Sequence, residues 1–324
     1  MIAIVAIAIA AGAASALMFA SIVSGALISL VLFYLAPLPL MVASIGWGPL
    51  CAAIGGVAAA SVLGLLFGVP YAIAYAVTAA LPAWWLGHLA MLGRPTAPAP
   101  HAGNGATPPA PVMEWYPPGR LLLWVAGFAV LTTMAALLTL GGDATAISAT
   151  MKRGILRMLG SRSSEPSADV ERAIDMFVSA VPVVAAVGAM MTLTINLWLA
   201  AKITATSVRL NRPWPNIRST ALPPMTLVAL CVAAAFCFTG GLLAMLAQVT
   251  ASALLMGYAL TGFAVLHTLT LPLRSRAVWL GCTYAIMVVF FWPVLAMVVL
   301  GLADALFGFR ERFARSRPPP LPTA

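Results

Sequence analysis

The sequence MIAIVAIAIAAGAASALMFA occupies residues 1–20, and it opens a longer block, residues 1–93, that contains no Asp, Glu, Lys or Arg. At about 1.5 Å per residue, a single helix of that length would measure about 140 Å. The hydrocarbon core of a bilayer is only about 30 Å thick. The block therefore predicts three or four membrane crossings rather than one.

The composition of the whole chain indicates the same class of protein. Hydrophobic residues make up 62% of the 324 residues and charged residues 8%, whereas a soluble domain is about 45–50% apolar and about 25% charged. Backbone in lipid must form its hydrogen bonds internally, in helices or in a closed barrel. Barrel strands would alternate apolar and polar residues, but the apolar stretches here are unbroken. We therefore expect an all-α, polytopic transmembrane helical bundle with about 7–9 spans.

The charge balance is basic. The formal net charge is +9, from 17 Lys and Arg against 8 Asp and Glu. In a soluble protein this excess would indicate a nucleic-acid partner, but the basic residues here lie between apolar stretches, where they meet lipid headgroups. The expected partner is the lipid bilayer of the cell inner (plasma) membrane, and no nucleic acid is expected.

A stretch rich in Pro, Gly and Ala, residues 94–119, divides the chain. This composition cannot build a hydrophobic core and is typical of a disordered aqueous linker. It separates an N-terminal membrane half, residues 1–93, from a C-terminal membrane half, residues 120–309. A basic, Pro-rich tail, residues 310–324, follows.

The C-terminal half is expected to begin with a span from Arg120 to about Leu140. In the first part of residues 143–172, apolar and basic residues fall on opposite faces of a helix. This amphipathic segment fits a helix that lies among lipid headgroups, and equally one that packs on the protein's own aqueous side. Four further hydrophobic segments are expected at about 175–201, 222–248, 251–271 and 277–301.

Two basic segments give conflicting evidence on orientation. The loop from Lys202 to Arg218 and the tail after Asp304 both favour the cytoplasmic side by the rule for loop charge. The three expected spans between them would place them on opposite sides. Either residues 277–309, which contain Pro293, do not form a single crossing, or one basic segment departs from the rule. We favour a cytoplasmic C-terminus.

No motif for catalysis is present in the sequence. It has no nucleotide-binding GxxxxGK[ST] loop and no HExxH, GxSxG or Cys–His constellation. The four cysteines lie in apolar stretches without CxxC spacing, so neither a metal site nor a cofactor is expected. The sequence therefore predicts a protein that is not an enzyme.

Polar residues inside membrane spans are costly and therefore point to function. The candidate ligand-binding residues are Asn196, with Thr192 one turn earlier, Trp198 in the same segment, and His267. An interhelical hydrogen bond explains Asn196 equally well. An interfacial or internally bonded histidine is the simpler interpretation of His267.

Three other polar residues are expected to have structural or interface roles. Gln248 is expected near a helix end. Asp304 is the only acid in the last span region, and it is expected to pair with Arg310 or Arg312 near the cytoplasmic edge. Nothing in the sequence suggests a chain of acids that could relay protons.

Several short segments, taken in order, resemble a known family. They are Ala36-Pro-Leu-Pro-Leu40 with Gly46-Trp-Gly48, then Ile195-Asn-Leu-Trp-Leu-Ala200 leading to Arg212-Pro-Trp-Pro215, and finally Leu300-Gly-Leu-Ala-Asp-Ala305 with Phe309-Arg310. Together they resemble the YybS-like family of multi-pass membrane proteins of unknown function. That family is distantly similar to the substrate-binding S components of energy-coupling-factor transporters.

The resemblance implies a helical bundle that captures a small nutrient and takes its energy from separate ATPase and transmembrane subunits. We therefore expect a substrate-binding subunit for the uptake of a small, vitamin-like molecule, without an ATPase of its own. The alternative is a structural or assembly factor of the cell envelope that transports no ligand. The basic amphipathic segment and the scarcity of polar groups inside the spans favour this alternative.

Overall fold

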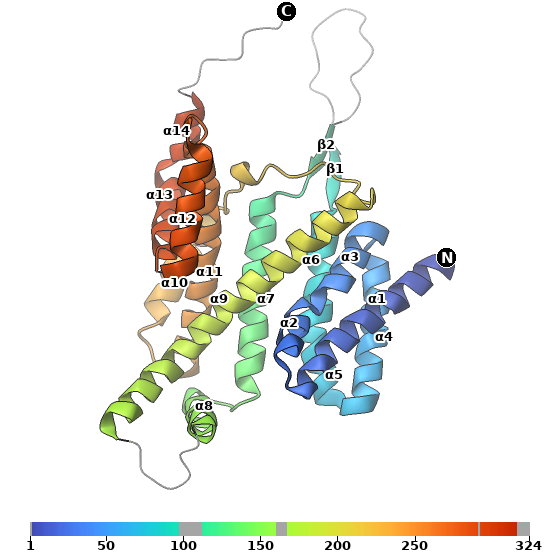
Figure 1. Cartoon of the computed structure of the whole chain (residues 1–324), viewed down its shortest axis with the longest axis vertical. Coiled ribbons are helices and arrows are strands. Elements are labelled where there is room, and N and C mark those ends of the chain that lie inside the picture. The colour runs from blue at the N-terminus through green and yellow to red at the C-terminus, as the bar shows by residue number, and fades with distance from the viewer. Residues whose placement is uncertain (1, 97–111, 160–166, 291, 316–324) are drawn as a thin grey trace, which may run out of the picture. The chain divides into compact units, whose positions relative to one another are not determined.

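The computed structural model describes residues 2–96, 112–159, 167–290 and 292–315 (Figure 1). Most of these residues are helical, and among them seven helices are long and apolar enough to cross a membrane. The predicted all-α, polytopic transmembrane fold is confirmed. Three shorter apolar helices accompany the seven, namely Met225–Phe236, Arg276–Phe290 and Val294–Phe307.

The chain forms two compact units, which are described separately below. Unit 1 consists of Met1–Phe128 and Met191–Trp214, and unit 2 of Ala129–Met190 and Pro215–Ala324. The division falls inside two helices, α7 (Pro118–Leu138) and α9 (Ala168–Thr206). The sequence had instead placed the boundary at the Pro-rich stretch 94–119.

Unit 1 begins with a series of helices connected by tight turns. They are α1 (Ile2–Ala20), α2 (Leu27–Leu35), α3 (Pro37–Trp47), α4 (Pro49–Phe67), α5 (Val69–Tyr75) and α6 (Leu81–Ala90), with short irregular helical turns at Ser21–Ser24 and Ala76–Ala80. Proline stands in the first turn of each of the last four, where no backbone N–H is needed. Four candidate spans lie within residues 2–90, where three or four crossings were expected.

Helices α1 and α4 pack with their backbones in close contact. A Cβ on Gly12 would overlap the carbonyl of Gly55, and a Cβ on Gly55 would overlap the carbonyl of Ala8. Nearby, the buried Tyr75 hydroxyl donates to Ser15 Oγ at 2.8 Å. Small residues and paired hydroxyls of this kind stabilise helix contacts in lipid, where burial of apolar surface gives no driving force.

Both ends of the predicted linker are ordered, which corrects the expectation of a disordered stretch there. Strand β1 (Gly93–Thr96) pairs antiparallel with β2 (Val112–Trp115). An ion pair between Arg94 and Glu114, at 2.7 Å, crosses the two strands and lowers the pKa of Glu114. Residues 97–111, the middle of the predicted linker, lie outside the described residues.

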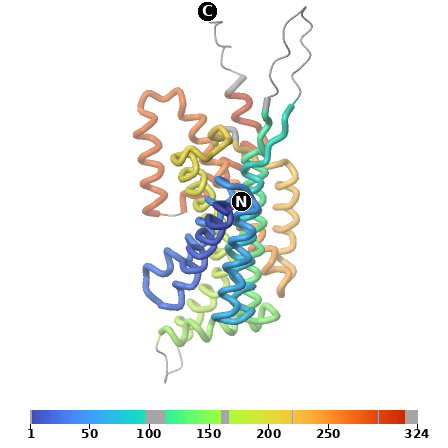
Figure 2. Tube along the Cα trace, turned by 90° about the vertical axis from the view of Figure 1, so that its right-hand side faces the viewer, coloured from blue at the N-terminus to red at the C-terminus, as the bar shows by residue number. Residues whose placement is uncertain are grey.

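Unit 2 contains the amphipathic helix α8 (Ala144–Met158), the first part of α9, a short turn at Ile217–Ser219, and five further helices. These are α10 (Met225–Phe236), α11 (Gly241–Leu269), α12 (Arg276–Phe290), α13 (Val294–Phe307) and α14 (Phe309–Arg315). Helix α11 is the centre of the unit and carries more of its buried residues than any other described helix. Helix α13 packs along α11. Helix α12 contacts α11 through the Tyr284 ring, which stacks on Phe263. Figure 2 follows the course of the chain through these helices in a second view.

Two predicted span boundaries in unit 2 are wrong. No break occurs between residues 248 and 251, because α11 is continuous there, and the chain turns earlier, where Gly240 and Gly241 have φ of 91° and 64°. Gln248 therefore lies inside a helix and not near its end. The segment 277–301 is two helices and not one span, because Pro293 precedes α13 and cannot continue a helix.

The division of residues 277–301 removes the conflict between the two basic segments. Neither of the short helices α12 and α13 is among the helices long enough to cross a membrane, so residues 277–301 are not counted as one crossing. The Arg310 guanidinium, just after α13, donates from Nη1 to the carbonyl oxygens of Arg218 and Thr220, both at 2.8 Å. The start of the C-terminal tail thus lies beside the end of the basic loop.

Candidate functional site

Unit 1 contains a cavity of about 480 Å³ at the end where α3 and α6 finish. Residues 44–48 of the α3–α4 junction, Met91 after α6, Trp115 of β2, and Arg209 and Asn211 after α9 line it. These residues come from four separate parts of the chain. The cavity is therefore built by the packing of unit 1 and not by a local motif.

Arg209 is the cationic side chain of this cavity. Its Cζ lies 5.2 Å from the centre of the Trp47 ring, an arrangement in which the cation is attracted to the electron-rich face of the ring. The described acid of unit 1, Glu114, is paired with Arg94. Arg209 consequently has no described carboxylate within ion-pair distance, and its charge is available to an anion in the cavity.

The turn that ends α9 holds Arg209 in place. The backbone N–H groups of Arg209 and Leu210 both donate to the Thr204 carbonyl, at 2.8 and 3.2 Å. Val208 has a φ of 55°, a left-handed conformation that a β-branched residue rarely adopts. Such strain persists only where the surrounding structure enforces it, and it is frequent at binding sites.

Arg212 has a different, structural role in the same loop. Its Nη1 donates to the Ala90 carbonyl at 2.8 Å and its Nη2 to the Tyr116 carbonyl at 3.0 Å. Burial lowers the pKa of Arg212, but an arginine remains charged at any physiological pH. Arg212 thus fastens the loop to the end of α6 and to the strand pair, and so fixes the position of Arg209.

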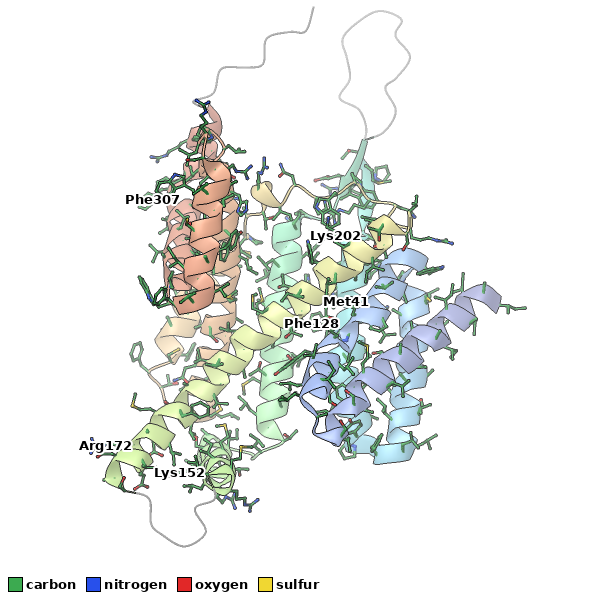
Figure 3. The ribbon with its side chains drawn as sticks, viewed as in Figure 1. Met41, Phe128, Lys152, Arg172, Lys202 and Phe307 are labelled. Carbon is green, nitrogen blue, oxygen red and sulfur yellow. The ribbon has the colours of Figure 1, made fainter. Side chains whose placement is uncertain are left out.

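Lys202 and Trp214 form a further contact between a cation and a tryptophan ring at this end of unit 1. Lys202, labelled at the end of α9 in Figure 3, places its Nζ 4.5 Å from the centre of the Trp214 ring. With Arg209 on Trp47 and Arg212 near Trp115, this end of unit 1 combines positive charge with aromatic surfaces. The arrangement suits an anion that also carries a planar or apolar part.

The residues proposed from the sequence as ligand contacts do not form one site. Asn196 is buried, and its Nδ2 donates to the Tyr34 carbonyl and to the Thr192 carbonyl, both at 2.8 Å. This is the interhelical hydrogen bond that the sequence left open, here joining α9 to α2. Trp198 is half exposed on α9, and neither it nor Thr192 lines the cavity.

His267 belongs to unit 2 and not to the unit that contains Asn196. Its Nδ1 lies 2.9 Å from the Phe263 carbonyl in the preceding turn, and its Nε2 lies 3.5 Å from the Tyr284 hydroxyl. Both ring nitrogens of His267 therefore already have partners, one in its own helix and one in α12.

The expected pairing of Asp304 with Arg310 is present, with 2.7 Å between Asp304 Oδ2 and Arg310 Nη2.

Sequence reasoning missed the cavity residues Trp47, Trp115 and Arg209. Trp47 and Arg212 lie in segments quoted above for the family resemblance, but the sequence contains no signal that brings Trp47 and Arg209 together. Comparison of the chain with protein-family models, with curated proteins and with solved structures finds no match. The resemblance to the YybS-like family therefore stays a prediction.

Proposed function

We propose that this integral membrane protein binds a small anionic molecule in the cavity at the basic end of unit 1. The observation that carries the proposal is Arg209, which lines the cavity, stacks on Trp47 and has no described acid partner. Ligand sites are typically about 300–1,000 Å³, apolar or aromatic in lining, with a few polar groups that fix orientation. The cavity volume of about 480 Å³ falls in that range.

The role we propose for this binding is small-molecule transport, as a substrate-binding subunit without a motor of its own. The support comes from the sequence, which lacks a nucleotide-binding loop and resembles a family distantly similar to S components. Separate ATPase and transmembrane subunits would then supply the energy. A vitamin-like carboxylate or phosphate ester has the charge and size that the cavity favours.

The distribution of basic residues supports a plasma-membrane orientation with this cavity facing the cytoplasm. At the cavity end, unit 1 carries Arg94, Arg120, Lys202, Arg209 and Arg212, whereas the turns at the opposite ends of α1 and α4 carry no Lys or Arg. Cytoplasmic loops are the ones enriched in Lys and Arg. The proposed ligand is then one that is bound or released on the cytoplasmic side.

This orientation predicts a cytoplasmic C-terminus. Green fluorescent protein fused after residue 324 should fluoresce, and alkaline phosphatase fused there should be inactive, because the phosphatase needs an oxidising compartment. The matched control is a pair of fusions truncated after residue 159, at the end of α8, for which the opposite pair of results is expected. An active phosphatase at the C-terminus would contradict the proposed orientation.

The ligand proposal predicts a stabilisation that depends on Arg209. Purified protein would be screened by thermal unfolding against vitamins and related carboxylates and phosphate esters. A true ligand at 100 times its Kd should add about 2.7 kcal/mol to the stability. The Arg209→Gln variant should lose most of this gain, because a neutral side chain cannot pair with the anion.

Arg94→Gln is the matched control for that screen. Arg94 lies at the same end of unit 1 but is exposed, pairs with Glu114 and does not line the cavity. The control variant should keep the full ligand-induced shift. A panel in which no compound stabilises the wild type, or in which Arg209→Gln responds as strongly as the wild type, would refute the site.

A second candidate function, an assembly factor of the cell envelope, is favoured by one observation. The end of α8 exposes Met158 and Leu159, which are 90% and 60% accessible. Photocrosslinkers placed along residues 144–159 would separate the two functions in cells. Adducts with envelope-assembly proteins would support the second candidate, and adducts with transporter subunits the first.

A further inference from the structure

Helix α8 is firmly docked on unit 2 through its first half. Ile147 is fully buried in a cluster with Met134 and Leu137 of α7, Ala186 of α9, and Met245 and Val249 of α11. Asp143 caps the helix, because its Oδ1 accepts the Ala146 N–H at 2.8 Å. The first half of α8 therefore packs on the protein itself, which is one of the two placements that the sequence allowed.

The end of α8 does not continue this packing. Met158 and Leu159 are 90% and 60% exposed. At the neighbouring start of α9, Met176 and Phe177 are 74% and 62% exposed. Met176 and Phe177 lie within the candidate span Ala168–Thr206, and Met158 and Leu159 lie in the segment between that span and the preceding one, Pro118–Leu138. The end of α8 therefore belongs to the segment that connects two candidate spans at one surface of the bilayer.

The charges around this apolar end are not equally available. Lys152, labelled in Figure 3, binds Glu171 and Asp175, each at 2.9 Å. These two hydrogen bonds raise the pKa of Lys152. Arg172, also labelled, pairs with Asp169 at 3.0 Å. The acidic residues on this part of α9 thus already form ion pairs with Lys152 or Arg172.

Arg153 and Arg157 are the basic residues left without a described carboxylate. Arg153 donates to the Ala149 carbonyl and to the Thr150 hydroxyl, at 3.3 and 3.0 Å, and both arginines are exposed. They are one helical turn apart and therefore lie on one face of α8. The end of α8 thus presents two available positive charges next to exposed Met158 and Leu159.

We infer that the C-terminal end of α8 is a membrane-surface anchor that inserts Met158 and Leu159 among lipid chains while Arg153 and Arg157 bind anionic lipid headgroups. An amphipathic helix in this position gains both from apolar burial and from attraction to anionic lipid. The occupant is the lipid surface itself, since exposed apolar and cationic groups coincide in the segment that connects two candidate spans. The inference is independent of the cavity in unit 1 and of its ligand.

The test measures how deeply the end of α8 enters the bilayer. In a variant whose four native cysteines are replaced, a nitroxide spin label would be attached to a cysteine at position 158. Full-length protein would be reconstituted in nanodiscs of phosphatidylcholine alone or with phosphatidylglycerol. Collision with oxygen should dominate over collision with a water-soluble nickel chelate when phosphatidylglycerol is present. A label at position 149, on the opposite face of α8, should stay accessible to the chelate in both lipids.

The arginines give the second arm of this test. Each basic residue near an anionic surface contributes a factor of about five to the population of the docked state. The double variant R153Q/R157Q should therefore shift the label at position 158 towards water, whereas Arg172→Gln, the paired arginine, should not. Equal exposure to the chelate in both lipids would overturn the inference. So would an identical depth in the double variant and the parent protein.

Discussion

Replacing Arg310 with Ala is expected to destabilise unit 2 by about 3–5 kcal/mol, the range found when one partner of a buried ion pair is removed. The side chains of Arg310 and Asp304 are only 14% and 7% exposed. Arg310 Nε donates to Asp304 Oδ2 at 2.8 Å, and the Arg310 backbone N–H donates to Oδ1 at 2.9 Å. Without the guanidinium, the Asp304 carboxylate would be buried without a counter-charge.

The loss of stability in Arg310→Ala should include more than the interaction with the Asp304 carboxylate. Arg310 Nη1 also donates to the carbonyl oxygens of Arg218 and Thr220, so one side chain connects the end of α13, the start of α14 and the loop before α10. The carbonyl of Thr220, a buried residue, would lose this donor, which adds to the cost. The Asp304→Asn variant should lose less than Arg310→Ala, because an amide oxygen still accepts hydrogen bonds from Arg310.

The free energies of unfolding would be measured by titration of detergent-solubilised protein with a denaturing detergent. Arg312→Ala, an exposed arginine on the same short helix, is the matched control and should change the stability by less than about 0.5 kcal/mol. Equal stabilities of Arg310→Ala and Arg312→Ala would show that the hydrogen bonds and ion pair of Arg310 do not stabilise unit 2.

The general fold could be predicted from the sequence because the solvent determines it. An uncharged, apolar block such as residues 1–93 would expose a large apolar surface to water. In lipid, the backbone must form its hydrogen bonds internally. The helix boundaries were harder to predict, because small and polar residues occur both at 239–241 and at 248–252, and either stretch could form the turn. The turn depends on Gly240 and Gly241, whose left-handed backbone is a property of the fold and not of the composition.

The candidate site could not be predicted for a related reason. Polar residues within apolar segments, such as Asn196, attract attention in the sequence, yet Asn196 uses its amide to hold α9 against α2. The cavity depends instead on Trp47 and Arg209, which are far apart in the chain and individually ordinary at a membrane interface. Only the folded chain brings them together.

The close contact between α11 and α13 leads to the second large expected effect. A Cβ on Gly262 would overlap the Met297 carbonyl, and a Cβ on Gly301 would overlap the Tyr258 carbonyl. Gly262→Ala and Gly301→Ala should therefore each force the two helices apart. We expect each to cost about 1–3 kcal/mol, the usual range for overpacking, with a larger loss for Gly301→Val.

A double-mutant cycle makes this prediction specific to the helix contact. Once either alanine has separated α11 from α13, the second alanine meets less resistance, so the double variant should lose clearly less than the sum of the two single losses. Gly281→Ala in α12 is the matched control, because its added Cβ would meet no heavy atom within 4 Å. If the two glycines act independently, the losses of stability will be additive. If the helix contact accommodates the added methyl groups, each single variant will lose no more stability than Gly281→Ala. The first result would show that the two glycines do not belong to one contact, and the second that close backbone approach does not hold α11 against α13.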